Sequence, residues 1–102
     1  MDFFQKVYTL CQRIPKGNVT TYKIIAHALG SKGYQAIGQV LKKNDQPEHI
    51  PCYRVVKSDG SIGGYHGDHS KNILKKIKKL KADGITVKNG KVNLKKHLFS
   101  FE

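Results

Sequence analysis

Residues 19–43, VTTYKIIAHALGSKGYQAIGQVLKK, decide the predicted fold. The β-branched step at 19–21 supplies a threonine cap for a helix that runs through Leu29 and stops at Gly30. A Ser-Lys-Gly turn follows, and a second amphipathic helix is expected over 34–43. Two short helices joined by a small glycine-containing turn indicate a helix-turn-helix, although many other helix pairs share this pattern.

Helical spacing recurs on both sides of this pair. Apolar residues between positions 2 and 14 predict a helix capped by Asp2, and Cys11 lies on its apolar stripe, so we expect Cys11 in the core. A further helix over 70–81 ends at Asp83-Gly84. Its expected apolar face is formed by Ile73, Leu74, Ile77 and Leu80. Its other face is lysine-rich and is either solvated or a phosphate contact.

Two hairpins complete the predicted fold. Val55-Val56 and Ser61-Ile62 flank a Ser-Asp-Gly turn and predict the first hairpin. Residues 85–94 alternate strictly around Asn89-Gly90, which suits a type I′ turn. The tail over 95–102 is expected to pack Leu98, Phe99 and Phe101 against the rest. The prediction is therefore an α+β, mainly helical fold: a winged helix-turn-helix-like domain with short β-hairpins.

The charge of the chain is its most unusual bulk property. The 102 residues contain 19 Lys and Arg against 7 Asp and Glu, a formal net charge of +12. Such a field attracts polyanions, with nucleic acid first and an acidic membrane surface or acidic protein behind it. High solubility or a lysine-rich thermophile surface are the alternatives.

Cysteine usage and hydropathy limit the remaining classes. The chain has 2 cysteines, which make neither a disulfide framework nor a four-ligand zinc site. It shows no signal peptide, and no apolar run approaches the roughly 20 residues that span a bilayer. We therefore expect an intracellular protein with reduced thiols and no membrane partner.

The stretch HIPCYRVVKSDGSIGGY, residues 49–65, draws attention to Cys52. A cysteine reacts as its thiolate, so a reactive one needs surroundings that lower its pKa. Cys52 follows a proline and lies near Arg54 in a strongly cationic molecule, which favours ionisation. A buried structural cysteine is the alternative, and the local residues leave both open.

Motifs spread along most of the chain resemble one family in order. Residues 51–55, PCYRV, resemble the Pro-Cys-His-Arg-Val active-site pattern of the O6-alkylguanine-DNA alkyltransferases. GNVTTYKIIA at 17–26 and YQAIGQVLKKN at 34–44 resemble the family's helix-turn-helix and the Asn that precedes its cysteine. SDGSIGGYHG at 58–67 and ADGITVKNGKVNL at 82–94 resemble its glycine-tyrosine loop and closing hairpin. The family's usual N-terminal domain has no counterpart here, so residues 1–102 are expected to form a single C-terminal-type domain.

The resemblance implies a suicidal DNA-repair protein. It would bind duplex DNA in the minor groove as a monomer and flip an O6-alkylated guanine into a pocket. Cys52 would take the alkyl group irreversibly, with no metal and no cofactor, because the thiolate is both nucleophile and final acceptor.

Roles pass from the family to matching positions. Four residues would serve the chemistry: Cys52 as nucleophile, Asn44 as a brace for the active-site loop, and Tyr53 and Asp83 as relay positions. The base pocket would be lined by Tyr65, Gly63, Tyr22 and Arg54. Contacts with DNA would come from Thr21, Tyr22, Lys23, Gln35, Ala36, Gly38 and Lys42. Tyr22 could instead pack on its helix face.

Three positions depart from the family pattern. Tyr53 replaces the family's His, and Asp83 replaces its Glu. Because Tyr is longer than His and Asp is shorter than Glu, the two changes compensate in length, and a Tyr53–Asp83 hydrogen bond could form. A neutral Tyr, with a pKa of about 10, is a poor base for a thiol whose pKa is about 8.5. Tyr53 would instead donate a hydrogen bond to the thiolate. Gln35 replaces an inserted Arg, which predicts weaker flipping with Tyr34 as a possible helper, or marks an ordinary surface residue.

Three functions fit these observations. The leading one is a single-turnover alkyltransferase. The second is an alkyltransferase-like lesion sensor, a class that replaces the cysteine, usually with Trp, and recruits other repair proteins. The third is a plain winged-helix DNA binder with an incidental cysteine, which explains the charge but not the ordered motifs.

Overall fold

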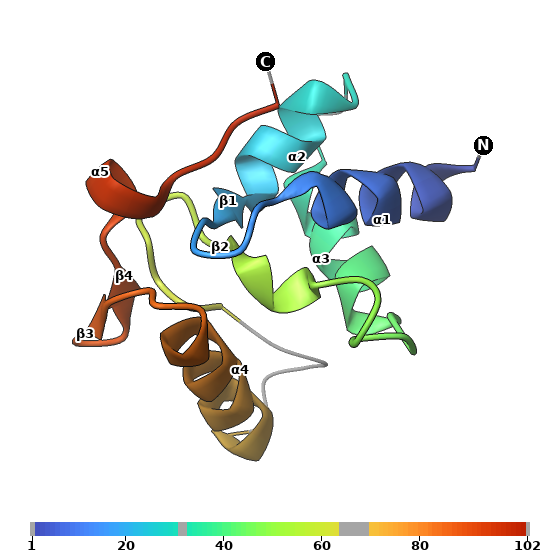
Figure 1. Ribbon diagram of the computed structural model, residues 1–102. Helices are drawn as coiled ribbons and strands as arrows, with labels where there is room; N and C mark the ends of the chain where they lie inside the picture. Colours follow the sequence, from blue (N-terminus) through green and yellow to red (C-terminus); the bar gives the residue numbers. More distant parts are fainter. Residues whose placement is uncertain (1, 31–32, 64–69, 102) are drawn as a thin grey trace.

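Helices dominate the architecture, and short strands tie them together (Figure 1). The computed structural model describes residues 2–30, 33–63 and 70–101. The helices are α1 (Phe3–Arg13), α2 (Tyr22–Ala28), α3 (Tyr34–Lys42), the 3-10 turn η1 (Cys52–Arg54), α4 (Ser70–Ala82) and α5 (Leu94–His97). The strands are β1 (Thr20–Thr21), β2 (Val55–Val56), β3 (Val87–Lys88) and β4 (Lys91–Val92). The predicted mainly helical α+β class is confirmed.

Side-chain caps begin the first two helices at the predicted residues. The Asp2 carboxylate accepts a hydrogen bond from the Gln5 amide at 2.8 Å, and the Thr21 hydroxyl accepts one from the Ile24 amide at 3.1 Å. Each satisfies a backbone donor that the first helical turn leaves without a partner. α2 and α3 then pack against each other, and α3 also packs on α1, as a helix-turn-helix requires.

The predicted hairpin over 55–62 forms only next to its turn. The Gly60 amide donates to the Lys57 carbonyl and the Lys57 amide donates to the Ser61 carbonyl, both at 2.9 Å. β2, however, pairs in parallel with β1, while Ser61 forms an antiparallel bridge with Lys91. Both valines of β2 are completely buried. A strand buried on both faces suits parallel pairing inside the core better than an exposed hairpin.

The second hairpin is confirmed. β3 and β4 pair antiparallel, with Val87 opposite Val92. The turn residues Asn89 and Gly90 have φ of 53° and 72°. Positive φ at both central positions is the geometry of a type I′ turn.

α4 is present as predicted, but the position of its buried face is different. Leu74, expected inside, is 65% exposed, whereas Lys76, expected on the solvated face, is 0% exposed. Lys76 and Ile77 lie three and four residues after Ile73, so they share its helix face, while Leu74 is turned away. The buried lysine is therefore part of the core beside η1.

The C-terminal segment ties the two ends of the chain together. The Val19 amide donates to the His97 carbonyl at 2.9 Å, and the Phe99 amide donates to the Val19 carbonyl at 2.8 Å. Phe99 and Phe101 pack partly against the core, but Leu98 remains exposed, contrary to expectation. Cys11 is fully buried within the same core, as predicted.

Candidate active site

Cys52 is the first residue of η1, and Asn44 holds the segment around it. The Asn44 amide nitrogen donates to the Ile50 carbonyl at 2.9 Å and to the Cys52 sulfur at 3.3 Å. Its side-chain oxygen accepts from the Gln46 amide at 2.9 Å. These contacts are the ones expected of a bracing Asn44, since one buried side chain bonds both to the segment before the cysteine and to the cysteine itself.

The thiol is more deeply buried than its sequence context suggests. Cys52 is 5% exposed, and this burial raises its pKa; the Asn44 hydrogen bond and the charges of Lys76 and Lys79 oppose the rise only in part. Of the two alternatives that the local residues left open, the structure favours the buried cysteine, because removal of water destabilises the thiolate more than the nearby donors and cations stabilise it.

Lys76 is the site residue that the sequence analysis missed. Its ammonium donates to the Val55 carbonyl at 2.6 Å and to the Ile62 carbonyl. Burial lowers the pKa of Lys76 to about 7, and the charge of Cys52 acts in the opposite direction. Its spacing within the apolar face of α4 was the available clue, but a lysine in a lysine-rich helix is usually solvated.

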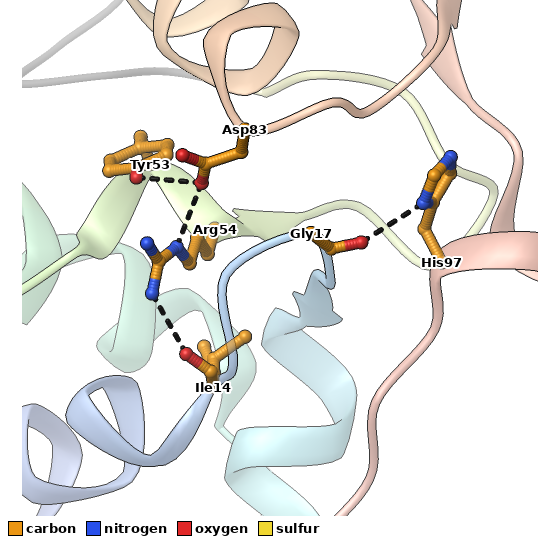
Figure 2. Close-up of polar contacts among 6 residues, drawn as sticks. All are labelled: Ile14, Gly17, Tyr53, Arg54, Asp83 and His97. Atoms are coloured by element: carbon orange, nitrogen blue, oxygen red, sulfur yellow. Dashed lines mark hydrogen bonds and ion pairs between the residues drawn. The ribbon is translucent and has the colours of Figure 1, made fainter.

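Figure 2 shows Asp83 between Tyr53 and Arg54, just after α4. The Tyr53 hydroxyl donates to Asp83 Oδ2 at 2.7 Å, which is the hydrogen bond predicted from the two substitutions. Arg54 Nε donates to the same oxygen at 3.0 Å, and Arg54 Nη1 donates to the Ile14 carbonyl at 2.9 Å. The network joins η1 to α4 and to the end of α1.

This network assigns the single hydroxyl proton of Tyr53 to Asp83. Burial, followed by the Asp83 hydrogen bond, raises the pKa of Tyr53. The alternative expectation, in which Tyr53 donates to the Cys52 thiolate, is not the arrangement in the structure. The cations that act on the thiol come from α4, and Arg54 is directed toward Asp83 and Ile14 instead.

A cavity of about 410 Å³ opens between α2, α3 and the segment after β2. Its walls are Tyr22, Lys23, Gln35, Gly38, Lys57, Ser58 and Gly63. The structure thus brings together several residues predicted separately for the base pocket and the DNA contact. Lys57 and Ser58 were not predicted, and Tyr65 lies outside the described residues.

Gly63 lies against Tyr22 at this cavity. It has φ of 72°, and a Cβ added there would lie 3.0 Å from the Tyr22 hydroxyl. A side chain at position 63 would therefore meet both backbone strain and the Tyr22 ring. Glycine is favoured here by its backbone conformation and by the nearby Tyr22 ring, before any ligand is considered.

Comparisons with known proteins now identify the family. Residues 2–85 match the family described as 6-O-methylguanine DNA methyltransferase, DNA binding domain. The chain belongs to this family. It is 45% identical over 101 residues to a bifunctional methyltransferase/endonuclease of Picrophilus torridus, a match that covers 98% of this chain and 33% of that protein. The chain thus spans about a third of the length of that relative.

Two further known proteins match the chain along nearly its whole length. A DNA base-flipping protein of Vibrio parahaemolyticus is 32% identical over 98 residues, covering 94% of each chain. The crystal structure of S. pombe Atl1 in complex with damaged DNA containing O6-carboxymethylguanine has a TM-score of 0.86 at 28% identity, covering 97% of this chain and 95% of that one. The family resemblance drawn from the motifs is confirmed.

Within this family frame, the predicted DNA-contact residues divide into two groups. Lys23, Gln35, Ala36 and Lys42 are exposed, and Gly38 is half-buried on α3. Thr21 is different, because its side chain is buried and its hydroxyl caps α2. A side-chain contact from Thr21 to a phosphate is therefore not supported by the geometry.

Arg54 belongs to a second cavity and not to the one beside Tyr22. This cavity of about 430 Å³ is lined by Gln12, Pro47, Glu48, His49, Pro51, Tyr53, Arg54 and Lys79. The sequence analysis placed Arg54 with Gly63 and Tyr22, and the structure corrects that grouping. The reason is its ion pair with Asp83, which draws the guanidinium toward α4 and α1.

The described part of the chain holds neither a cluster suited to a metal ion nor a helix suited to a membrane. No group of three or more His, Cys, Asp or Glu residues there is arranged to hold a metal ion. Likewise, no helix among those residues is long and apolar enough to cross a membrane.

Proposed function

We propose that this protein repairs DNA by transferring an alkyl group from O6-alkylguanine to its own Cys52. The observation that carries the proposal is the retained cysteine, held by Asn44 beside the buried cation of Lys76. A cysteine kept only for packing needs neither a hydrogen bond to sulfur nor a buried charge. Residues 1–102 would act as one functional unit. Every described helix except α5 contributes apolar residues to one buried cluster, and Leu94 of α5 packs against that cluster.

Duplex DNA would lie along the exposed face of α2 and α3. Lys23 and Lys42 are exposed there and can neutralise phosphates. Ala36 and Gly38 are small, so α3 can approach the floor of a minor groove closely. The extruded guanine would enter the cavity of about 410 Å³ beside Tyr22 and Gly63. Cys52 is not among the described walls of this cavity and is 5% exposed, so transfer would also require the sulfur to become accessible to the base.

The reaction exchanges one bond for another. The Cys52 sulfur forms a bond to the alkyl carbon as the bond from that carbon to guanine O6 breaks. The thiol proton ends on the released guanine, so the products are a thioether and an unmodified base. Lys76 and Lys79 stabilise the thiolate that attacks, and no further reactant is needed.

A second function, the lesion sensor, is favoured by the burial of the thiol. The pKa of Cys52 is raised rather than lowered, which slows transfer at neutral pH. A protein with this site could hold alkylguanine for longer than it takes to react with it. The two functions share the DNA surface and the cavity and differ only in what happens at the sulfur.

Transfer of a labelled methyl group separates them. A duplex with one labelled O6-methylguanine is mixed with the wild-type protein, with Cys52→Ser and with Cys11→Ser, the matched control at the other buried cysteine. We expect label on the wild type and on Cys11→Ser, and none on Cys52→Ser, which should still bind the duplex. Preferential binding without label on any form would favour the sensor. No label together with no preference for the lesion duplex would remove both functions.

A further inference from the structure

α4 has two faces with different surroundings. Ile73, Lys76, Ile77 and Leu80 face the rest of the protein and are buried or half-buried, and α4 packs there on η1 and β3. Lys75, Lys78 and Lys81 are exposed on the other side. Figure 1 shows α4 apart from α2 and α3, and none of the three lysines lines the cavity beside Tyr22. This outward lysine face therefore does not belong to the site described above.

Among the described residues, no acidic side chain compensates the charge of the outward lysine face. Residues 70–82 contain no Asp and no Glu, and the next acidic residue, Asp83, is paired with Arg54 and bonded to Tyr53. Lys75, Lys78 and Lys81 repeat at intervals of three residues, so neighbouring like charges repel each other on the helix surface. Thermophile surfaces, by contrast, interleave both signs in ion-pair networks.

We propose that the outward lysine face is a second contact with the DNA backbone, separate from the α2–α3 surface. The inference rests on the proposed function, because it takes DNA to be bound by the same molecule. Three residues along a helix advance about 4.5 Å, and duplex DNA carries one charge for each 1.7 Å or so of its axis, so the row can meet several phosphates. The bound segment is a flanking stretch of the same duplex.

A protein partner fits this face less well. Protein interfaces depend on aromatic or arginine anchors in well-packed centres. The outward lysine face offers only Leu74 as an apolar side chain, 65% exposed beside the lysines. Phosphates need no such anchor, since lysine ammonium groups bind them as point charges.

Salt titrations of two triple variants test the proposal. The first is Lys75→Gln, Lys78→Gln and Lys81→Gln, and its control is Lys88→Gln, Lys95→Gln and Lys96→Gln, which are exposed on β3 and α5. Each removes three charges and lowers the formal net charge from +12 to +9. Affinity for an undamaged duplex of about 30 base pairs is measured against salt concentration, because each phosphate contact contributes about one unit to the slope.

We expect the α4 triple variant to lose about two to three units of slope and the control less than one. Equal losses would mean that only net charge matters, and would overturn the proposal. An unchanged slope in the α4 variant would also overturn it, leaving a solvated face or an acidic protein partner. Failure of the wild type to bind any duplex would remove the proposed function itself. Circular dichroism confirms that both variants fold.

Discussion

At the scale of single residues, Cys52 is governed by two opposing effects. Burial disfavours the thiolate, while the Asn44 amide and the Lys76 and Lys79 charges favour it, and burial prevails. The thiol is therefore protonated in most molecules at neutral pH, and the reactive species is a minority. The raised pKa also protects the cysteine from unwanted reactions before a substrate arrives.

The first prediction concerns the pH dependence of transfer. Because the pKa of Cys52 is raised, the thiolate fraction grows as pH rises through neutrality, so single-turnover transfer should accelerate between about pH 6 and pH 9. Lys76, with a pKa of about 7, loses its charge over the same range, so the acceleration should be less than tenfold per pH unit. A rate that is flat over this range would contradict a raised thiol pKa.

The second prediction concerns Tyr53. Tyr53→Phe removes the hydrogen bond to Asp83, and the free energy of unfolding should fall by about 1–2 kcal/mol, measured by denaturant titration. The pKa of Cys52, followed by its alkylation rate against pH, should change little. A marked rise of that pKa with unchanged stability would show that Tyr53 serves the thiolate instead.

At the scale of elements, α4 shows what the sequence could and could not predict. Its extent follows from local periodicity, and so do the caps Asp2 and Thr21 and the Asn89-Gly90 turn. The burial of Lys76 does not, because it depends on two carbonyls supplied by β2 and the segment after it. A charged side chain is buried in a core only when other groups there bond to it, and the groups that bond Lys76 are distant in sequence.

The pairing of β2 also depends on a partner that is distant in sequence. Two adjacent valines predict a strand, but not which strand lies beside it, and the partner β1 is more than thirty residues earlier. The candidate site residues Cys52, Asn44, Tyr53 and Asp83 came from the family resemblance, and the Tyr53–Asp83 bond came from the lengths of the two replaced side chains. The depth of the sulfur was not, because burial is a property of the assembled fold.

The third prediction concerns the effect of the buried Lys76 on the pH dependence of stability. Folding lowers the pKa of Lys76 from 10.5 to about 7, so above pH 7 the unfolded chain holds more protons and the free energy of unfolding should rise with pH. Denaturant titrations between about pH 6.5 and pH 9 should show this rise in the wild type and lose it in Lys76→Met. The exposed control Lys75→Met should keep it; an equal rise in all three would contradict the assignment.

The fourth prediction compares two aspartates. Asp83→Asn weakens a largely buried network with Arg54 and Tyr53 and should lower the free energy of unfolding by about 2 kcal/mol. Asp59→Asn removes an exposed pair with Lys91, with 4.0 Å between the charged atoms, and should change the free energy of unfolding far less, because exposed ion pairs contribute little. Equal losses in thermal or denaturant unfolding would show that Asp83 does not join η1 to α4.

At the scale of the whole molecule, the site is held in place by contacts from both ends of the chain. His97 lies 3.0 Å through Nδ1 from the Gly17 carbonyl (Figure 2), and Phe99 donates to Val19. The family match covers residues 2–85, so these C-terminal contacts lie beyond the matched region. These contacts hold β1 in place. β1 pairs with β2, and the Val55 carbonyl of β2 accepts a hydrogen bond from Lys76.

The central claim is that Cys52 is the final acceptor of an alkyl group. The most direct measurement is peptide mass spectrometry of the protein after reaction with a duplex containing O6-methylguanine. Our account predicts the mass of one methyl group on the peptide that contains Cys52 and none on the peptide that contains Cys11. Both peptides unmodified, under conditions in which the duplex is bound, would contradict it.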